Sequence, residues 1–236
     1  VVLAAGVGSR LQPYTNNIPK CMIDVAGMPL LHRLLQQIEA LRGKGTLRAH
    51  VVIGYQSWVI RHYFSSTSLR INFIENPRYT HTNNMYSLSL ATQHLTPEAD
   101  LVIVNGDCIY DPEILQTVVT RNFSCIAVDS SVYFAESMKV RVHDGYVRGI
   151  SKDYQPGDSV ITSIDLYKFA RREKSRLLGE VARLVNSGIV DQWTEIAIDR
   201  ISRESDVRIV PVDISGRRWA EIDNLYDLEA ARQLFA

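Results

Sequence analysis

The hydrophobic and polar positions of this chain follow two different patterns in its two halves. In the first half, short and almost wholly apolar runs alternate with segments of helical periodicity. Continuous apolar runs are typical of strands that are covered on both faces of a parallel sheet. The pattern predicts strands at 1–5, 51–54, 71–75, 101–104 and 124–128, and helices at 29–41, 58–64, 85–94 and 112–121, with a Gly-rich turn at 43–45.

The pattern of the second half predicts antiparallel strands. Asp144-Gly145 lies between two alternating segments, 139–142 and 147–151, and Asp-Gly is a typical hairpin turn. Further strands are predicted at 160–167, 209–212 and 218–222, and helices at 174–186, 193–202 and 225–235. We found no linker-like stretch, so we expect a single α/β domain over 1–236 with a central mixed, mostly parallel sheet flanked by helices.

Composition narrows the function without naming it. The 236 residues include 26 Lys+Arg and 26 Asp+Glu, and a zero net charge argues against a nucleic-acid partner. No apolar run approaches the roughly 18 residues that cross a bilayer, so no membrane partner is expected. Cys21, Cys108 and Cys125 are scattered and lack zinc-ligand spacing, which favours a reduced, cytoplasmic protein. Because the chain opens directly on a core strand, we expect a short segment upstream of Val1.

A glycine-rich loop follows the first predicted strand. Small residues there let the backbone approach a phosphate or a base, and backbone N–H groups in such loops bind anions. Arg10 adds a planar cation suited to phosphate oxygens. The dinucleotide fingerprint GxGxxG fails because its last position is Leu11, and no GxxxxGK[ST] is present. Taken alone, the loop could also be a tight turn with Arg10 on the surface.

The longer segment LAAGVGSRLQPYTNNIPKCMIDVAGMPLL resembles the AAGxGxRxxPxTxxxPKxxxxxxGxPL pattern of nucleotidyltransferases that couple an NTP to a phosphorylated acceptor. The resemblance implies a Rossmann-like domain with a nucleotide-binding half (1–128) and an acceptor-binding half (129–236). It also implies that Arg10 contacts the leaving phosphates and that Lys20, otherwise an ordinary exposed lysine, neutralises charge near the reacting phosphorus. The nucleotide would lie along Leu3, Ala4, Ala5, Gly6, Val7, Gly8 and Ser9.

Two aspartates are candidate metal ligands. Asp107 follows a buried strand, and ligands of open α/β sheets bind at the carboxyl ends of strands. Mg²⁺ prefers one or two carboxylates together with phosphate oxygens. In the family that the chain resembles, a second aspartate lies late in the sequence, and Asp223 matches it. Asp223 could instead cap the helix that begins near 225. Asp111 and Glu221 are neighbours that could support the site.

The segment from Thr82 to Leu88 resembles the NNxYSL stretch of phosphocholine and phosphonate cytidylyltransferases. The resemblance implies that Asn83, Asn84 and Ser87 bind the nucleotide and that CTP is the donor. Amide side chains suit contact with a base edge because they present both donors and acceptors. One of the two asparagines could simply cap the helix.

The acceptor site is less defined by the sequence. Lys152 matches the family lysine that meets the acceptor phosphate, and Lys139 could act in the same way, although both could be solvated strand lysines. An aromatic face would also suit a quaternary ammonium group. Further candidates for the far end of the acceptor are Asp129, Asp165, Trp193 and Glu195.

We therefore expect a Mg²⁺-dependent enzyme that transfers CMP from CTP to a small acceptor and releases pyrophosphate. The acceptor would be of the 2-hydroxyethylphosphonate, 2-aminoethylphosphonate or phosphocholine class. A sugar-1-phosphate nucleotidyltransferase is the alternative of the same class. An inactive nucleotide-sensing subunit is the other alternative, but Arg10, Lys20, Asp107 and Asp223 are all retained. Fusion to other catalytic domains, or a homo-oligomer, stays open.

Overall fold

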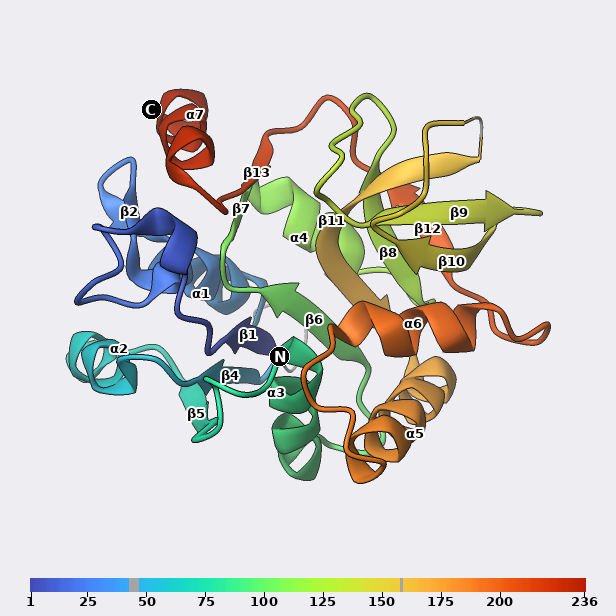
Figure 1. The fold of residues 1–236 in the computed structure, drawn as a ribbon, viewed down its shortest axis with the longest axis horizontal. Coiled ribbons are helices and arrows are strands. Elements are labelled where there is room, and N and C mark those ends of the chain that lie inside the picture. Colours follow the sequence, from blue (N-terminus) through green and yellow to red (C-terminus); the bar gives the residue numbers. More distant parts are fainter. Residues whose placement is uncertain (43–46, 158) are drawn as a thin grey trace.

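A nine-stranded mixed sheet runs through the molecule (Figure 1). The computed structural model describes residues 1–42, 47–157 and 159–236. At one side of the sheet the neighbouring strands are parallel, in the order β6-β1-β4-β5. These strands are β1 (Val2–Ala4), β4 (Ala49–Ile53), β5 (Ile71–Glu75) and β6 (Leu101–Asn105).

The other side of the sheet is built around one long strand. β11 (Val160–Phe169) pairs antiparallel with β6, β8 (Cys125–Asp129) and β9 (Lys139–His143). β10 (Tyr146–Ser151) forms the predicted hairpin with β9, and β12 (Val210–Asp213) pairs parallel with β8. Asp144 and Gly145 in the hairpin turn have φ of 51° and 77°, the left-handed conformation that an Asp-Gly turn supplies.

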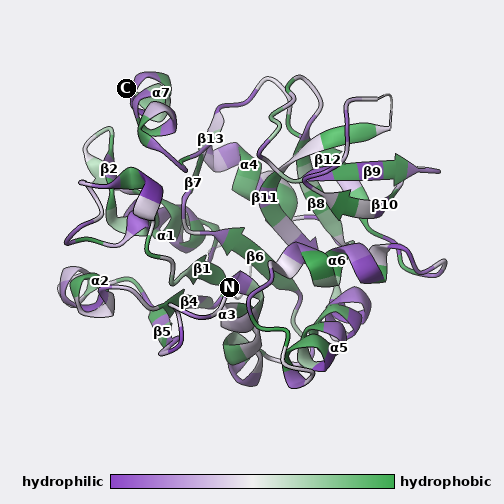
Figure 2. Cartoon of the chain, in the orientation of Figure 1, coloured by the Kyte–Doolittle hydropathy of each residue, from purple (hydrophilic) through white to green (hydrophobic). Residues whose placement is uncertain are grey.

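Helices cover both faces of the sheet, and the strand sequences explain how. Val2 and Ala4 pack in one core cluster with side chains of α1 (Leu30–Leu41), α2 (Ser57–Phe64) and α4 (Pro112–Val119). Leu3, between them, packs in the cluster formed with α3 (Asn84–Ala91), α5 (Arg171–Asn186) and α6 (Thr194–Ser202). Alternate side chains of a strand point to opposite faces, so an all-apolar strand fills both cores. The central strands are accordingly hydrophobic, whereas outer helix faces are mixed (Figure 2).

A third, smaller core joins the two ends of the chain. It contains Leu11, Ile23 and Val25 from the first segment and Ile222 and Leu228 from the last. Its residues come from a 3₁₀ turn (Ser9–Leu11), β2 (Asp24–Val25), β7 (Cys108–Tyr110) and α7 (Leu225–Phe235), with β13 (Trp219–Glu221) packed against them. The neighbouring elements are β3 (Met28–Pro29), which pairs with β2, and a second 3₁₀ turn at Lys20–Met22. β7 pairs antiparallel with β13, which brings residues near 108 beside residues near 221.

The structure confirms the predicted mixed α/β fold, with shifts at element ends. The helix predicted at 174–186 begins at Arg171, and the strand predicted at 160–167 continues to Phe169. The helix predicted at 85–94 spans Asn84–Ala91 and is followed by a 3₁₀ turn, Thr92–His94. The turn predicted at 43–45 lies outside the described residues. Within the described ranges, no helix combines the length and hydrophobicity that crossing a membrane requires. The three cysteines are buried and free.

Candidate active site

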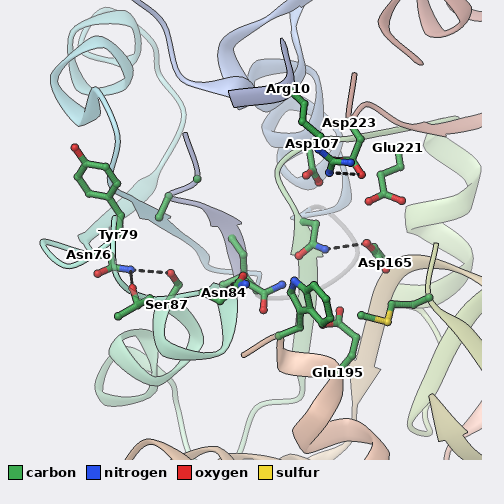
Figure 3. A pocket seen from close by; sticks show the side chains of 18 of the residues that line it. Arg10, Asn76, Tyr79, Asn84, Ser87, Asp107, Asp165, Glu195, Glu221 and Asp223 are labelled. Carbon is green, nitrogen blue, oxygen red and sulfur yellow. Dashed lines mark hydrogen bonds and ion pairs between the residues drawn. The ribbon is translucent and has the colours of Figure 1, made fainter. Parts of the chain in front are cut away.

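A pocket of about 250 Å³ lies where the parallel strands end (Figure 3). Ala5 and Gly6 follow β1, Asn76 follows β5, and Asn105 is the last residue of β6. The position obeys the rule that open α/β sheets bind ligands at the carboxyl ends of their strands. The lining is completed by Leu3, Arg10, Tyr79, Thr82, Asn83, Asn84, Ser87, Asp107, Met138, Lys152, Asp165, Trp193, Glu195, Glu221 and Asp223.

The glycine-rich loop is held against the lysine that follows it. Gly8 has φ of 68°, and a Cβ added there would lie 2.8 Å from Lys20 Cβ. The buried Thr15 hydroxyl donates a hydrogen bond of 2.8 Å to the Gly8 carbonyl. Glycine is therefore required for this approach, because a side chain would collide and would strain the backbone. Of the predicted loop residues, Leu3, Ala5 and Gly6 line the pocket, whereas Ala4, Val7, Gly8 and Ser9 do not.

Two cations and two aspartates form one charge network. Lys20 Nζ lies 2.7 Å from Asp107 Oδ2 and 2.6 Å from Asp223 Oδ1, and Arg10 Nη2 lies 2.9 Å from Asp223 Oδ2. Burial alone would lower the pKa of Lys20, but the two carboxylates raise it above its ordinary value. Burial likewise opposes the charge of Asp223, and Lys20 and Arg10 nevertheless hold its pKa below the ordinary value. Lys20 thus contacts the predicted metal ligands and is not itself a lining residue.

A third carboxyl group completes a candidate cation site. One ligand oxygen from each of Asp107, Glu221 and Asp223 lies within 4.8 Å of the other two. Burial, together with Asp165, Asp107 and Asp223, raises the pKa of Glu221 to about 9. Oxygen donors of this kind fit a hard divalent cation. The capping role considered for Asp223 belongs to Asn224, whose side chain accepts from the backbone of Tyr226 and Asp227. Asp111 lies apart, in an ion pair of 3.0 Å with Arg218.

Amide and hydroxyl groups line the opposite wall. Asn83 caps α3 through its own side chain, so the capping role expected for one of the two asparagines falls to Asn83. Asn84 Oδ1 accepts a hydrogen bond from the backbone N–H of Thr194 at 2.7 Å. Asn76 Nδ2 donates to Ser87 Oγ at 3.1 Å (Figure 3). These bonds fix α3 against α6 and hold the polar side chains at the pocket. Asn83, Asn84 and Ser87 therefore come together as predicted.

The third wall carries two buried carboxyl groups and an aromatic ring. Asp165 and Glu195 are both buried, and Asn105 Nδ2 donates to Asp165 Oδ2 at 2.9 Å. Burial raises the pKa of Asp165 to about 6 and that of Glu195 to about 7. Lys152 Nζ lies 5.0 Å from the centre of the Trp193 ring. Four predicted acceptor residues thus meet in one place.

The structure does not bring two other acceptor candidates to the pocket. Lys139 Nζ is fully buried and donates to the carbonyl of Ala135 at 2.7 Å, so it anchors the loop before β9. Asp129 accepts from Trp219 Nε1 at 2.8 Å and from the backbone of Ser131 at 2.9 Å. Both side chains bond to neighbouring segments and neither residue lines the pocket, which corrects the expectation that they face the acceptor.

The comparison with protein families decides the family of the chain. Residues 1–142 match the model described as a MobA-like NTP transferase domain. The chain belongs to this family. The match covers β1, the glycine-rich loop, Lys20 and Asp107, and thus includes the lining residues Ala5, Gly6 and Asp107.

Individual members of the NTP transferase family align over nearly the whole chain. CTP:phosphoglutamine cytidylyltransferase of Campylobacter jejuni is 26% identical over 97% of both chains. Choline-phosphate cytidylyltransferase of Streptococcus pneumoniae is 27% identical over 99% of this chain and 96% of its own. A solved structure of CTP:phosphocholine cytidylyltransferase from the same species covers all of this chain and 97% of its own, with a TM-score of 0.74 and 22% identity.

The fold is also shared with enzymes that act on sugar phosphates. A Bacillus anthracis structure described as a glucose-1-phosphate thymidylyltransferase covers 99% of this chain and 93% of its own. Its TM-score is 0.80 at 14% sequence identity. This similarity supports the fold alone and leaves the acceptor undefined.

Several lining residues of this NTP transferase domain were missed by the sequence analysis. Asn76 and Asn105 each stand at the end of a predicted parallel strand, so the rule that pointed to Asp107 could have found them as well. Glu221 was noted as a neighbour only. Thr82 begins the segment that resembles the NNxYSL stretch but was not itself singled out, whereas Tyr79 and Met138 follow no pattern in the sequence that would have placed them in the pocket.

Proposed function

We propose that the protein transfers CMP from CTP to a small phosphate or phosphonate acceptor and releases pyrophosphate. The observation that carries this proposal is one pocket, in an NTP transferase domain, that is lined by Arg10, Asp107 and Asp223, with Lys20 ion-paired to both aspartates behind the lining. The names of the two full-length relatives support cytidine as the base. The acceptor class, 2-hydroxyethylphosphonate, 2-aminoethylphosphonate or phosphocholine, is the finer part of the proposal.

The chemistry requires little covalent work from the protein. An acceptor oxygen that is already anionic attacks the α-phosphorus of CTP in line, and pyrophosphate leaves, so no general base is needed. Catalysis then depends on positioning and on stabilising negative charge. Arg10, whose side chain is 60% exposed and which lines the pocket, would meet the leaving phosphates. Lys152, on the other side, orients the acceptor anion.

The residues that would hold Mg²⁺ are Asp107 and Asp223, with Glu221 beside them. The fit rests on the three converging carboxyl groups, since hard oxygen donors suit this ion. When bound, Mg²⁺ supplies positive charge to the phosphate oxygens. Lys20 lies between the same two aspartates, so it balances their charge within the protein and stays next to the reacting groups.

Pyrophosphate release tests the proposal. The purified protein is assayed with CTP, UTP, GTP and dTTP, each combined with a phosphonate, phosphocholine or a hexose-1-phosphate, with and without Mg²⁺. We expect release that requires CTP, a small phosphate or phosphonate, and Mg²⁺. Activity confined to UTP or dTTP with a hexose-1-phosphate would identify a sugar nucleotidyltransferase instead. Absence of release with every pair would favour the inactive, nucleotide-sensing alternative.

Two matched aspartates provide the variant control. Asp107→Asn removes a carboxylate of the candidate cation site and should lower turnover about 100-fold or more, as loss of transition-state charge stabilisation does. Asp111→Asn makes the same chemical change four residues later, at a side chain paired with Arg218 outside the pocket. It should leave turnover within about twofold. Equal effects of the two changes would contradict the assigned role.

A further inference from the structure

One tyrosine hydroxyl bridges the two buried carboxyl groups of the pocket. The Tyr167 hydroxyl oxygen lies 2.8 Å from Asp165 Oδ1 and 2.8 Å from Glu195 Oε1. A hydroxyl has one hydrogen to donate, so it can satisfy only one of the two oxygens. The other contact is a hydrogen bond only when a carboxyl group itself holds a proton. Without a ligand, the pair is therefore built to share a proton and to carry about one negative charge.

Glu195 also has an oxygen that nothing satisfies. Oε2 finds no hydrogen-bond partner in the described parts of the chain, although the residue is 2% exposed and lines the pocket. Leaving a buried acceptor unpaired costs free energy, so such groups in native proteins call for an explanation. Asp165 is equally unusual, because it lies within β11 with φ of 58°, where the register with β8 shifts. Two strained or unpaired acceptors thus meet at one wall.

The charges around the pair do not neutralise it. Lys152 is the nearby cation, but in the described residues it forms no ion pair with Asp165 or Glu195 and lies against the Trp193 ring. Asp107, which directly precedes β7, and Glu221 of β13 add further negative charge near Asp165. Tyr167 supplies its single proton from β11. The wall is therefore short of hydrogen-bond donors and of positive charge.

We infer that the acceptor carries a primary ammonium group, which binds between Asp165 and Glu195 while its phosphate or phosphonate faces Lys152. An ammonium brings positive charge and three N–H donors to a wall that is short of both. A trimethylammonium group has the charge but no N–H, so the Glu195 oxygen would stay unpaired. A hydroxyl group donates one hydrogen but adds no charge. The inference rests on the proposed function and narrows its acceptor to an aminoalkyl phosphate or phosphonate.

Matched acceptors that differ only at nitrogen test the inference. One set contains 2-aminoethylphosphonate, its N,N,N-trimethyl analogue and 2-hydroxyethylphosphonate; the other contains phosphoethanolamine, phosphocholine and the glycol phosphate. We measure kcat/KM for pyrophosphate release with saturating CTP and Mg²⁺. One set, phosphonates or phosphates, should react faster than the other. In that set, kcat/KM for the primary amine should exceed kcat/KM for both analogues by about 10- to 100-fold, the range for a charge-assisted hydrogen bond.

Variants then assign the preference to the wall. Glu195→Gln and Asp165→Asn keep size and remove charge, and each should reduce the advantage of the amine over the hydroxyl acceptor by about tenfold or more. Asp191→Asn, at an exposed carboxylate two residues before Trp193, should leave this ratio unchanged. The wild-type comparison needs no variant, so a folding defect cannot obscure the result.

The possible failures are distinguishable. If neither set gives any release of pyrophosphate, the proposed function is wrong and the inference falls with it. If release occurs but the trimethyl or hydroxyl acceptor equals the amine, the proposed function stands and only the ammonium site is refuted. A ratio that survives both Glu195→Gln and Asp165→Asn would also overturn the assignment to these two residues.

Discussion

Replacing Lys20 by methionine tests whether this residue balances the charge of the pocket. Methionine keeps most of the volume and removes the ammonium group, which makes contacts of 2.7 and 2.6 Å with Asp107 and Asp223. The side chains of Lys20, Asp107 and Asp223 are only 13%, 25% and 16% exposed. Without the ammonium group, the two carboxylates would therefore face one another with little water between them. We expect the free energy of unfolding to fall and turnover to be nearly lost.

The size of the effect follows from this burial. Breaking a buried ion pair costs about 3–5 kcal/mol because a charge is left uncompensated. Arg10 still contacts Asp223 at 2.9 Å, and both aspartates keep some solvent, so we expect the lower end, about 3 kcal/mol. In a domain of this size that corresponds to a fall of about 6–12 °C in Tm. Because Lys20 also lies beside the reacting groups, kcat/KM should fall by about 100- to 1000-fold.

Urea denaturation and pyrophosphate release measure the two effects. Mg²⁺ should restore part of the lost stability of Lys20→Met, because it would supply the missing positive charge to the carboxylates. Arg61→Met is the control, since its ion pair with Glu75 is 3.4 Å long and about half exposed on both sides. It should change stability by about 0.5 kcal/mol or less. A Lys20→Met protein as stable as the control variant would refute the charge-balance argument, and one of nearly normal turnover would refute the catalytic role.

Two further predictions concern the same network. Gly8→Ala would place a Cβ 2.8 Å from Lys20 Cβ, at a residue with φ of 68°, so its kcat/KM should fall about tenfold or more. The control is Gly216→Ala, because Gly216 has a similar φ of 83° but open space around it. A comparable loss of activity in the control would show that the contact with Lys20 is not the cause. Asp223 has a pKa below its ordinary value of 3.8 because Lys20 and Arg10 outweigh the effect of burial, so its stabilisation is complete above about pH 4 and is lost as the pH falls through the lower, folded-state pKa. Urea denaturation of Asp223→Asn should accordingly show a difference from wild type at pH 7 that shrinks towards pH 2, and a constant difference would exclude this linkage.

The long elements and one wall of the site could be predicted from the sequence. Apolar runs and helical periodicity place β1, β6 and α7 within a few residues, because burial on a sheet face dictates the residue type. The strand-end rule then finds Asp107. β2 and β7, of two and three residues, were not predicted, because segments this short show no period of their own.

The acceptor wall shows what such patterns leave out. Asp165 was among the acceptor candidates, but it lies in the middle of a strand, and its place in the pocket depends on a shifted register and a left-handed backbone, neither of which an amino-acid pattern reveals. Lys139 and Asp129, at ends of strands, were candidates as well. Their side chains instead bond to neighbouring loops, and that choice is made by tertiary packing.

The contact between Lys20 and Asp223 joins residues 203 positions apart. A ribosome adds Asp223 and the strand β13 before it only after the parallel strands and both large cores have been synthesised. A nascent chain that already holds the glycine-rich loop, Lys20 and Asp107 still lacks the partner that balances them. The charge network of the pocket is therefore completed last, and a prematurely terminated chain would keep Lys20 and Asp107 without Asp223.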